Sequence, residues 1–110
     1  MTIPDPNSGS TLERLIAELL EELPDVTTAP GGAGRAWSRG KDEIAVVGPF
    51  GVEIRLDRQV AAAAIRTPDT APSPRGPDWI RFNPRELDPH ALDRLGAWLE
   101  LAHRRAGEQT

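Results

Sequence analysis

Two short apolar-rich segments separated by a four-residue turn, the second with alternating apolar and polar residues, constrain the fold of this chain most strongly. The segments EIAVV (residues 43–47) and VEIRL (residues 52–56) flank the turn Gly-Pro-Phe-Gly at residues 48–51. A loop of this length and composition is typical of a β-hairpin. In the second segment the apolar residues share one face, and Glu53 and Arg55 share the other. The pattern predicts antiparallel strands with one buried face and one wetter face.

Two long amphipathic helices are predicted on either side of this hairpin. Leucine and isoleucine recur at helical spacing over residues 12–23, and Pro24 ends that helix. The second long helix begins with Asp88 as N-cap and continues to about residue 105. A shorter helix is predicted over residues 57–65. The apolar stripes of the long helices can cover one face of a sheet and leave the other face partly open.

Three further segments are predicted as strands, at residues 26–29, 35–39 and 78–82. The intervening residues 67–78 carry four prolines and no regular pattern. We interpret them as an extended loop, either a plain connection or a lid and partner contact for the open sheet face.

The fold class that follows is a two-layer α+β domain. It has an antiparallel sheet of four to five strands, backed by two long helices and one short helix. We expect a single domain over residues 10–106, a disordered leader over residues 1–9 and a tail over residues 107–110.

Composition excludes several classes of function. The chain has no cysteine, which rules out disulfide frameworks, zinc–thiolate sites and thiol chemistry. Its net charge of −4 opposes binding to nucleic acids. The longest apolar run, residues 60–65, is far shorter than a membrane helix, and the first residues do not resemble a secretory signal. We therefore expect a cytoplasmic protein that binds neither membrane nor nucleic acid.

No catalytic or cofactor motif emerges from the sequence. His90 and His103 fall on different faces of the last helix, so they cannot form a ligand pair, and we expect both at the surface or at helix ends. The glycine-rich residues 31–34 lack the Lys-Ser/Thr ending of a phosphate-binding loop. We predict no metal and no cofactor.

The wetter sheet face is the candidate functional surface. Alternation places Glu53, Arg55, Trp79 and Arg81 on that face, and Trp37 is a further candidate. Arginine and indole side chains suit an anionic or aromatic ligand. In the alternative interpretation, cross-strand Glu–Arg and Trp–Arg pairs only stabilise a solvated sheet face, and Trp79 packs under the proline-rich segment.

The sequence favours a non-enzymatic domain that binds a partner protein or a small anionic or aromatic ligand. The alternative is a small enzyme or enzyme accessory that uses Glu43 or Glu53 as its acid/base group. A homodimer could form through the alanines at residues 61–64 or through an edge strand.

From residue 43 onward the chain resembles the small "luciferase domain" family, whose bacterial members are mostly of unknown function. The resemblance rests on EIAVVG, GVEIRLDRQVAAAAI and DWIRFNPRELDPHALDRLGAWLELAHRRA, with the leading helix and LPDV also similar. Many members carry His-x-His where this chain has Val46 and Val47, and Gly where it has Asp78. The resemblance thus implies no histidine-dependent activity here. The architecture also resembles MmcQ/YjbR-like domains, for which DNA binding has been proposed and to which the acidic charge is unsuited.

Overall fold

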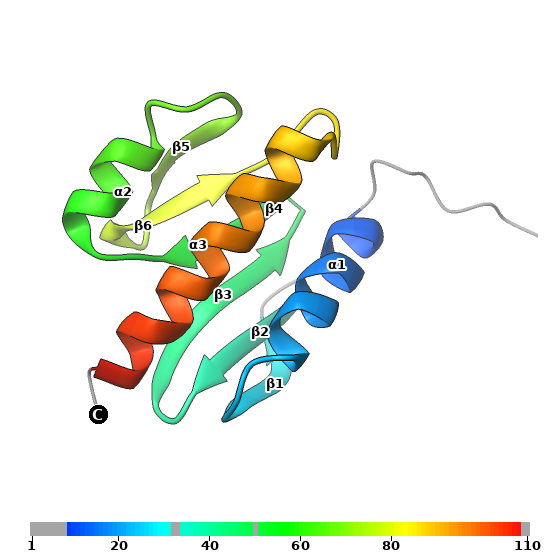
Figure 1. Ribbon diagram of the computed structural model, residues 1–110, viewed down its shortest axis with the longest axis vertical. Coiled ribbons are helices and arrows are strands. Elements are labelled where there is room, and N and C mark those ends of the chain that lie inside the picture. The colour runs from blue at the N-terminus through cyan, green and yellow to red at the C-terminus, as the bar shows by residue number, and fades with distance from the viewer. Residues whose placement is uncertain (1–8, 32–33, 50, 109–110) are drawn as a thin grey trace, which may run out of the picture.

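A six-stranded antiparallel sheet forms one layer of the protein, and three helices pack against one of its faces (Figure 1). The computed structural model describes residues 9–31, 34–49 and 51–108. The strand order across the sheet is β1-β2-β3-β4-β6-β5, and every neighbouring pair is antiparallel. In chain order the elements are α1 (Gly9–Glu21), β1 (Val26–Gly31), β2 (Gly34–Arg39), β3 (Asp42–Gly48), β4 (Gly51–Arg55), α2 (Arg58–Ala64), β5 (Thr70–Ser73), β6 (Gly76–Phe82) and α3 (Pro89–Glu108). The predicted α+β class is confirmed.

The predicted leader and tail lie mostly outside the described residues, at residues 1–8 and 109–110. Within the described part of the chain, α1 already begins at Gly9 and α3 continues to Glu108, a few residues beyond the expected end.

The hydrophobic core lies between the sheet and the helices. A row of four ladder partners crosses the inner face of the sheet, namely Trp37, Ala45, Ile54 and Ile80. All four are fully buried, and all three helices contribute residues to the same apolar cluster. The predicted alternation in β4 is confirmed, because its apolar side chains are buried while Glu53 and Arg55 retain partial exposure.

The prediction of a loop over residues 67–78 was wrong for most of that segment, and the sheet has six strands instead of four to five. Strand β5 and the start of β6 pair there as a hairpin, so the segment is part of the sheet and not a lid. Proline was a misleading signal because Pro72 lies on an edge strand, where a missing N–H need not interrupt the ladder. Pro30 lies on the opposite edge strand, β1. Prolines at both edges disfavour a homodimer built by edge pairing.

A hydrogen bond of His103 links α3 to the segment between α1 and β1. Its Nε2 lies 2.7 Å from the carbonyl oxygen of Pro24, and Arg39 Nη1 donates to the His103 carbonyl at 3.1 Å. We expected His103 at the surface or at a helix end; it lies in the C-terminal part of α3, but the imidazole is buried, so the surface alternative was wrong. Helical periodicity alone does not show that the segment between α1 and β1 packs against His103.

The β3–β4 turn gives a test of backbone geometry, because its two end glycines have different surroundings. Gly51 has φ +101°, and a Cβ there would collide with the carbonyl oxygen of Phe82, whereas a Cβ on Gly48 would meet no atom within 4 Å. We expect Gly51→Ala to lower the free energy of unfolding in urea titrations by about 2 kcal/mol. Gly48→Ala should change it by less than about 0.5 kcal/mol. Equal losses in the two variants would contradict this account of the turn.

Candidate functional site

The face of the sheet opposite the helices brings together four of the five residues predicted for the site. On neighbouring strands β4 and β6, Glu53 lies opposite Arg81 and Arg55 lies opposite Trp79. We call the surface formed by Glu53, Arg55, Trp79 and Arg81, together with the adjoining β5–β6 turn, the outer face.

Trp37 does not belong to the outer face, and its assignment there was wrong. It lies opposite Ala45 in the row that faces the helices, and it is fully buried. Its indole N–H is also buried and has no hydrogen-bond acceptor among the described residues. The face that a residue on β2 takes depends on the register between strands, which is irregular beside Trp37, and that register cannot be obtained from alternation within one strand.

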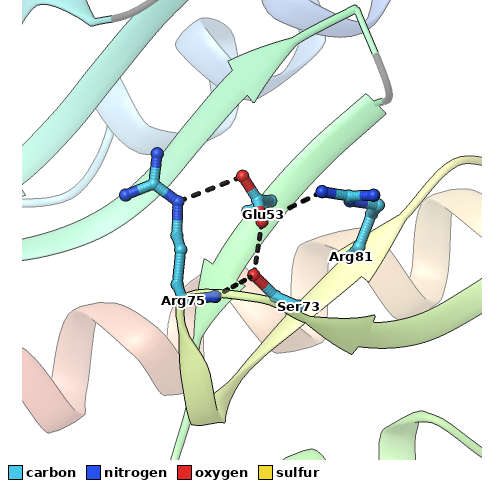
Figure 2. A network of polar contacts seen from close by, with 4 residues as sticks. All are labelled: Glu53, Ser73, Arg75 and Arg81. Carbon is cyan, nitrogen blue, oxygen red and sulfur yellow. Dashed lines mark hydrogen bonds and ion pairs between the residues drawn. The ribbon is translucent and has the colours of Figure 1, made fainter.

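Glu53 is the centre of a polar network on the outer face (Figure 2). Ser73 Oγ donates a hydrogen bond to Glu53 Oε2, and Arg75 Nε donates to Oε1 at 3.0 Å. Arg81 Nη2 lies 3.7 Å from Oε2. The backbone N–H of Arg75 in turn donates to Ser73 Oγ at 3.1 Å. These contacts attach the β5–β6 hairpin to the central strand β4.

The sequence analysis missed Ser73 and Arg75 as members of this site. Both lie in the segment interpreted as a loop, so no strand register placed them near Glu53. A usable signal was present in the sequence Ser-Pro-Arg-Gly at residues 73–76, since a two-residue turn between extended segments is typical of a hairpin.

The pKa of Glu53 is held below its ordinary value of 4.5. Burial acts to raise this pKa, but the hydrogen bonds from Ser73 and Arg75 and the positive charges of Arg75 and Arg81 outweigh burial. Glu53 is therefore an ionised carboxylate with its oxygens already engaged. Such a group is a poor proton donor and a weak base near neutral pH.

Asp78 forms a second carboxylate cluster at the start of β6. Arg55 Nε donates to Asp78 Oδ2 at 2.8 Å, and Arg105 Nη2, from α3, lies 3.5 Å from the same oxygen. Burial acts to raise the pKa of Asp78, but hydrogen bonds and the charges of the two arginines lower it overall. Arg55 is thus held in place by a neighbour on the next strand.

Trp79 is covered on the outer face. Its side chain is only 7% exposed, and the guanidinium carbon of Arg75 lies 5.1 Å from the ring centroid. This arrangement is a cation–π contact. A ligand cannot stack on the face of the ring that Arg75 covers unless Arg75 moves aside.

The two clusters together carry more positive than negative charge. Four guanidinium groups, those of Arg55, Arg75, Arg81 and Arg105, surround only the two carboxylates of Glu53 and Asp78. Arg105 comes from α3 and its side chain is 18% exposed, so the outer-face arginines number three against the two carboxylates. Their excess is one positive charge, in a chain whose net charge is −4. The side chains of Arg55, Arg75 and Arg81 are each about one-third exposed, so this charge is accessible from solvent.

Glu43, the other carboxylate considered for catalysis, lies elsewhere on the sheet. It pairs with Ser38 near the β2–β3 turn, whereas the ladder partner of Glu53 on β3 is Val46. Within residues 9–31, 34–49 and 51–108, no group of three or more His, Asp or Glu side chains is arranged to hold a metal ion.

The chain matches no protein-family model, no curated protein and no solved structure. The resemblance to the luciferase domain family stays a prediction. No helix in the described part of the chain is long and apolar enough to cross a membrane.

The lowered pKa values of Glu53 and Asp78 predict how stability depends on pH. Both carboxyls bind protons less readily in the folded state than in the unfolded chain, so they stabilise the fold at neutral pH. This stabilisation is lost as the pH falls from about 5 through their lowered folded values. We expect Glu53→Gln to lower the free energy of unfolding by about 1 kcal/mol at pH 7, with a smaller difference from wild type at about pH 3.

Urea titrations at several pH values measure this effect, and Glu18→Gln on the exposed side of α1 is the control. A pH-independent difference between Glu53→Gln and wild type would show that the network does not depend on the charge of Glu53.

Proposed function

We propose that this protein is a non-catalytic binding domain, and that its outer face recognises an anionic group on a partner protein or small ligand. The observation that carries the proposal is the set of three accessible arginines, Arg55, Arg75 and Arg81, which exceed the carboxylates of Glu53 and Asp78 by one positive charge. The groups that would contact the anion are the guanidiniums of Arg55, Arg75 and Arg81.

The arrangement of these arginines supports anion recognition. A guanidinium offers a planar set of N–H donors that matches a carboxylate or phosphate, and binding is tighter when the donors are already oriented. Here Asp78 accepts a hydrogen bond from Arg55 Nε, and Glu53 accepts one from Arg75 Nε. These bonds restrict the two arginine side chains. The carboxylate contacts of Arg55 and Arg75 use Nε, and a guanidinium has further N–H groups on its Nη atoms that can donate to a ligand.

The anionic part of the predicted ligand is better supported than the aromatic part. Arg75 covers a face of Trp79, so an aromatic ligand has to displace a cation–π contact before it can stack there. An anion at the edge of the Arg75 guanidinium needs no such displacement.

A catalytic role for Glu53 has less support. A general acid at neutral pH needs a raised pKa, and the surroundings of Glu53 lower it. For Glu43, the other carboxylate considered, no catalytic partner is indicated. We therefore favour binding over enzymatic activity, with a cytoplasmic partner or metabolite as the expected ligand.

Thermal-shift screening against small carboxylates, phosphates and acidic peptides tests the proposal. We expect at least one anionic compound to raise the Tm of the wild-type protein, and the effect to weaken with added salt. Arg81→Gln and Arg75→Gln should each weaken the affinity about tenfold, because each removes a charge-assisted hydrogen-bond donor.

Arg14→Gln makes the same change of charge on the exposed side of α1 and should leave the affinity unchanged. The proposal is contradicted if the ligand binds both outer-face variants as tightly as wild type. It is also contradicted if no anionic compound stabilises the protein.

A further inference from the structure

A groove of about 470 Å³ separates α1 from α3 on the helical layer of the protein. Both helices pack on the face of the sheet opposite the outer face (Figure 1). The inner wall of the groove is apolar and consists of Leu19, Leu23, Leu92, Gly96, Ala97 and Leu99. Leu92 is 37% exposed, and Leu19 and Leu23, which line the same groove, are half-buried, so the exposed apolar surface here comes from several residues. The groove therefore leaves apolar surface in contact with water.

The groove remains open because α3 has small residues where it passes α1. A Cβ added to Gly96 would meet no atom within 4 Å, so the backbone of α3 is accessible at this point. Glycine is also a poor helix former, and the helix itself gains nothing from having it at this position. The space at Gly96 and Ala97 is wide enough for the side chains of another element to enter.

The rim of the groove is acidic. Glu22 follows the end of α1, and Asp93 and Glu100 lie on α3, all three on exposed positions. The residues that line the groove include three carboxylates and no basic side chain. A complementary ligand therefore needs apolar side chains for the floor of the groove and positive charges for its rim.

We infer that this groove binds an amphipathic, basic helix of a partner protein. Leucine-like side chains of the helix would pack on the floor, and its lysines or arginines would lie near Glu22, Asp93 and Glu100. A helix suits the groove because the neighbouring helices α1 and α3 present ridges and grooves of side chains against which a third helix can pack. The proposal is separate from the anion site on the outer face, and the two ligands have opposite charge.

A second copy of this chain fits the groove less well than a basic helix. In a symmetric contact through α1 and α3, the same carboxylates of both copies would face one another. Glu18 and Glu21 on α1 would add to this repulsion. Charge complementarity therefore favours a basic partner.

A synthetic peptide tests the proposal directly. The probe is a fluorescein-labelled helix of about 18 residues, with leucines at helical spacing on one side and lysines on the other. We expect the full chain to bind it at low salt in anisotropy titrations, and to bind it more weakly as salt is added. A peptide with the same composition in scrambled order, and one with glutamate in place of lysine, should each bind at least about tenfold more weakly.

Gly96→Leu is the decisive variant, because its Cβ meets no atom within 4 Å and its side chain extends from the helix at the groove. It should raise the Tm by about 5 °C, because leucine replaces glycine inside a helix, and yet weaken peptide binding at least about tenfold. Ala63→Leu, on an exposed position of α2, is the matched control and should leave binding unchanged. The triple variant Glu22→Gln, Asp93→Asn, Glu100→Gln should weaken binding about tenfold at low salt and reduce its salt dependence.

Three results would overturn the inference. The first is equal affinity of wild type and Gly96→Leu for the leucine–lysine peptide, and the second is equal affinity of wild type for the scrambled peptide. The third is self-association of the wild-type chain in sedimentation experiments that Gly96→Leu abolishes, because the groove would then be occupied by a second copy. A failed anion screen on the outer face would leave these results unaffected.

Discussion

The arrangement of the outer face depends on the hydrogen bonds and ion pairs made by the ionised carboxylate of Glu53. A partly buried charge is tolerated only when nearby donors replace the water it has lost, and Ser73, Arg75 and Arg81 supply them. All three residues belong to the β5–β6 hairpin, and Ser73 and Arg75 lie at its turn, so satisfying Glu53 also positions that turn. The position of the turn brings Arg75 over Trp79 and so covers the indole. One carboxylate thus connects sheet assembly with the shape of the proposed binding surface.

The two proposed binding surfaces differ in the sign of their charge. The outer face has an excess of positive charge around Glu53 and Asp78, whereas the groove between α1 and α3 has an acidic rim. The net charge of −4 does not reveal this separation. Since the sheet lies between the two surfaces, a ligand on one surface does not occlude the other. Under the two proposals, the domain would contact an anionic group and a basic helix at the same time.

The parts of the fold predicted from sequence are those set by local patterns, and the errors concern non-local relationships. The two-residue period of β4 and the helical period of α1 and α3 predicted the buried faces, because each pattern is complete within one element. Strand β5 was missed because tolerance for Pro72 depends on its place at the sheet edge. Trp37 was misplaced because its face depends on an irregular register with β3. In the site, alternation predicted the grouping of Glu53 with Arg81, but Ser73 and Arg75 required knowledge of the hairpin.

Arg75 connects the anionic and the aromatic parts of the predicted ligand. Its Nε donates a hydrogen bond to Glu53, and its guanidinium carbon lies over the Trp79 ring. A ligand anion that draws this guanidinium away from the ring exposes the indole face at the same moment. A ligand that carries both an anionic and an aromatic group can then exchange the internal cation–π contact for its own stacking contact, with little net loss of ring contacts. Ligands with only an aromatic group lack the charge that displaces Arg75. Recognition on the outer face is therefore expected to begin with the anion, and Trp79 contributes only after Arg75 has moved.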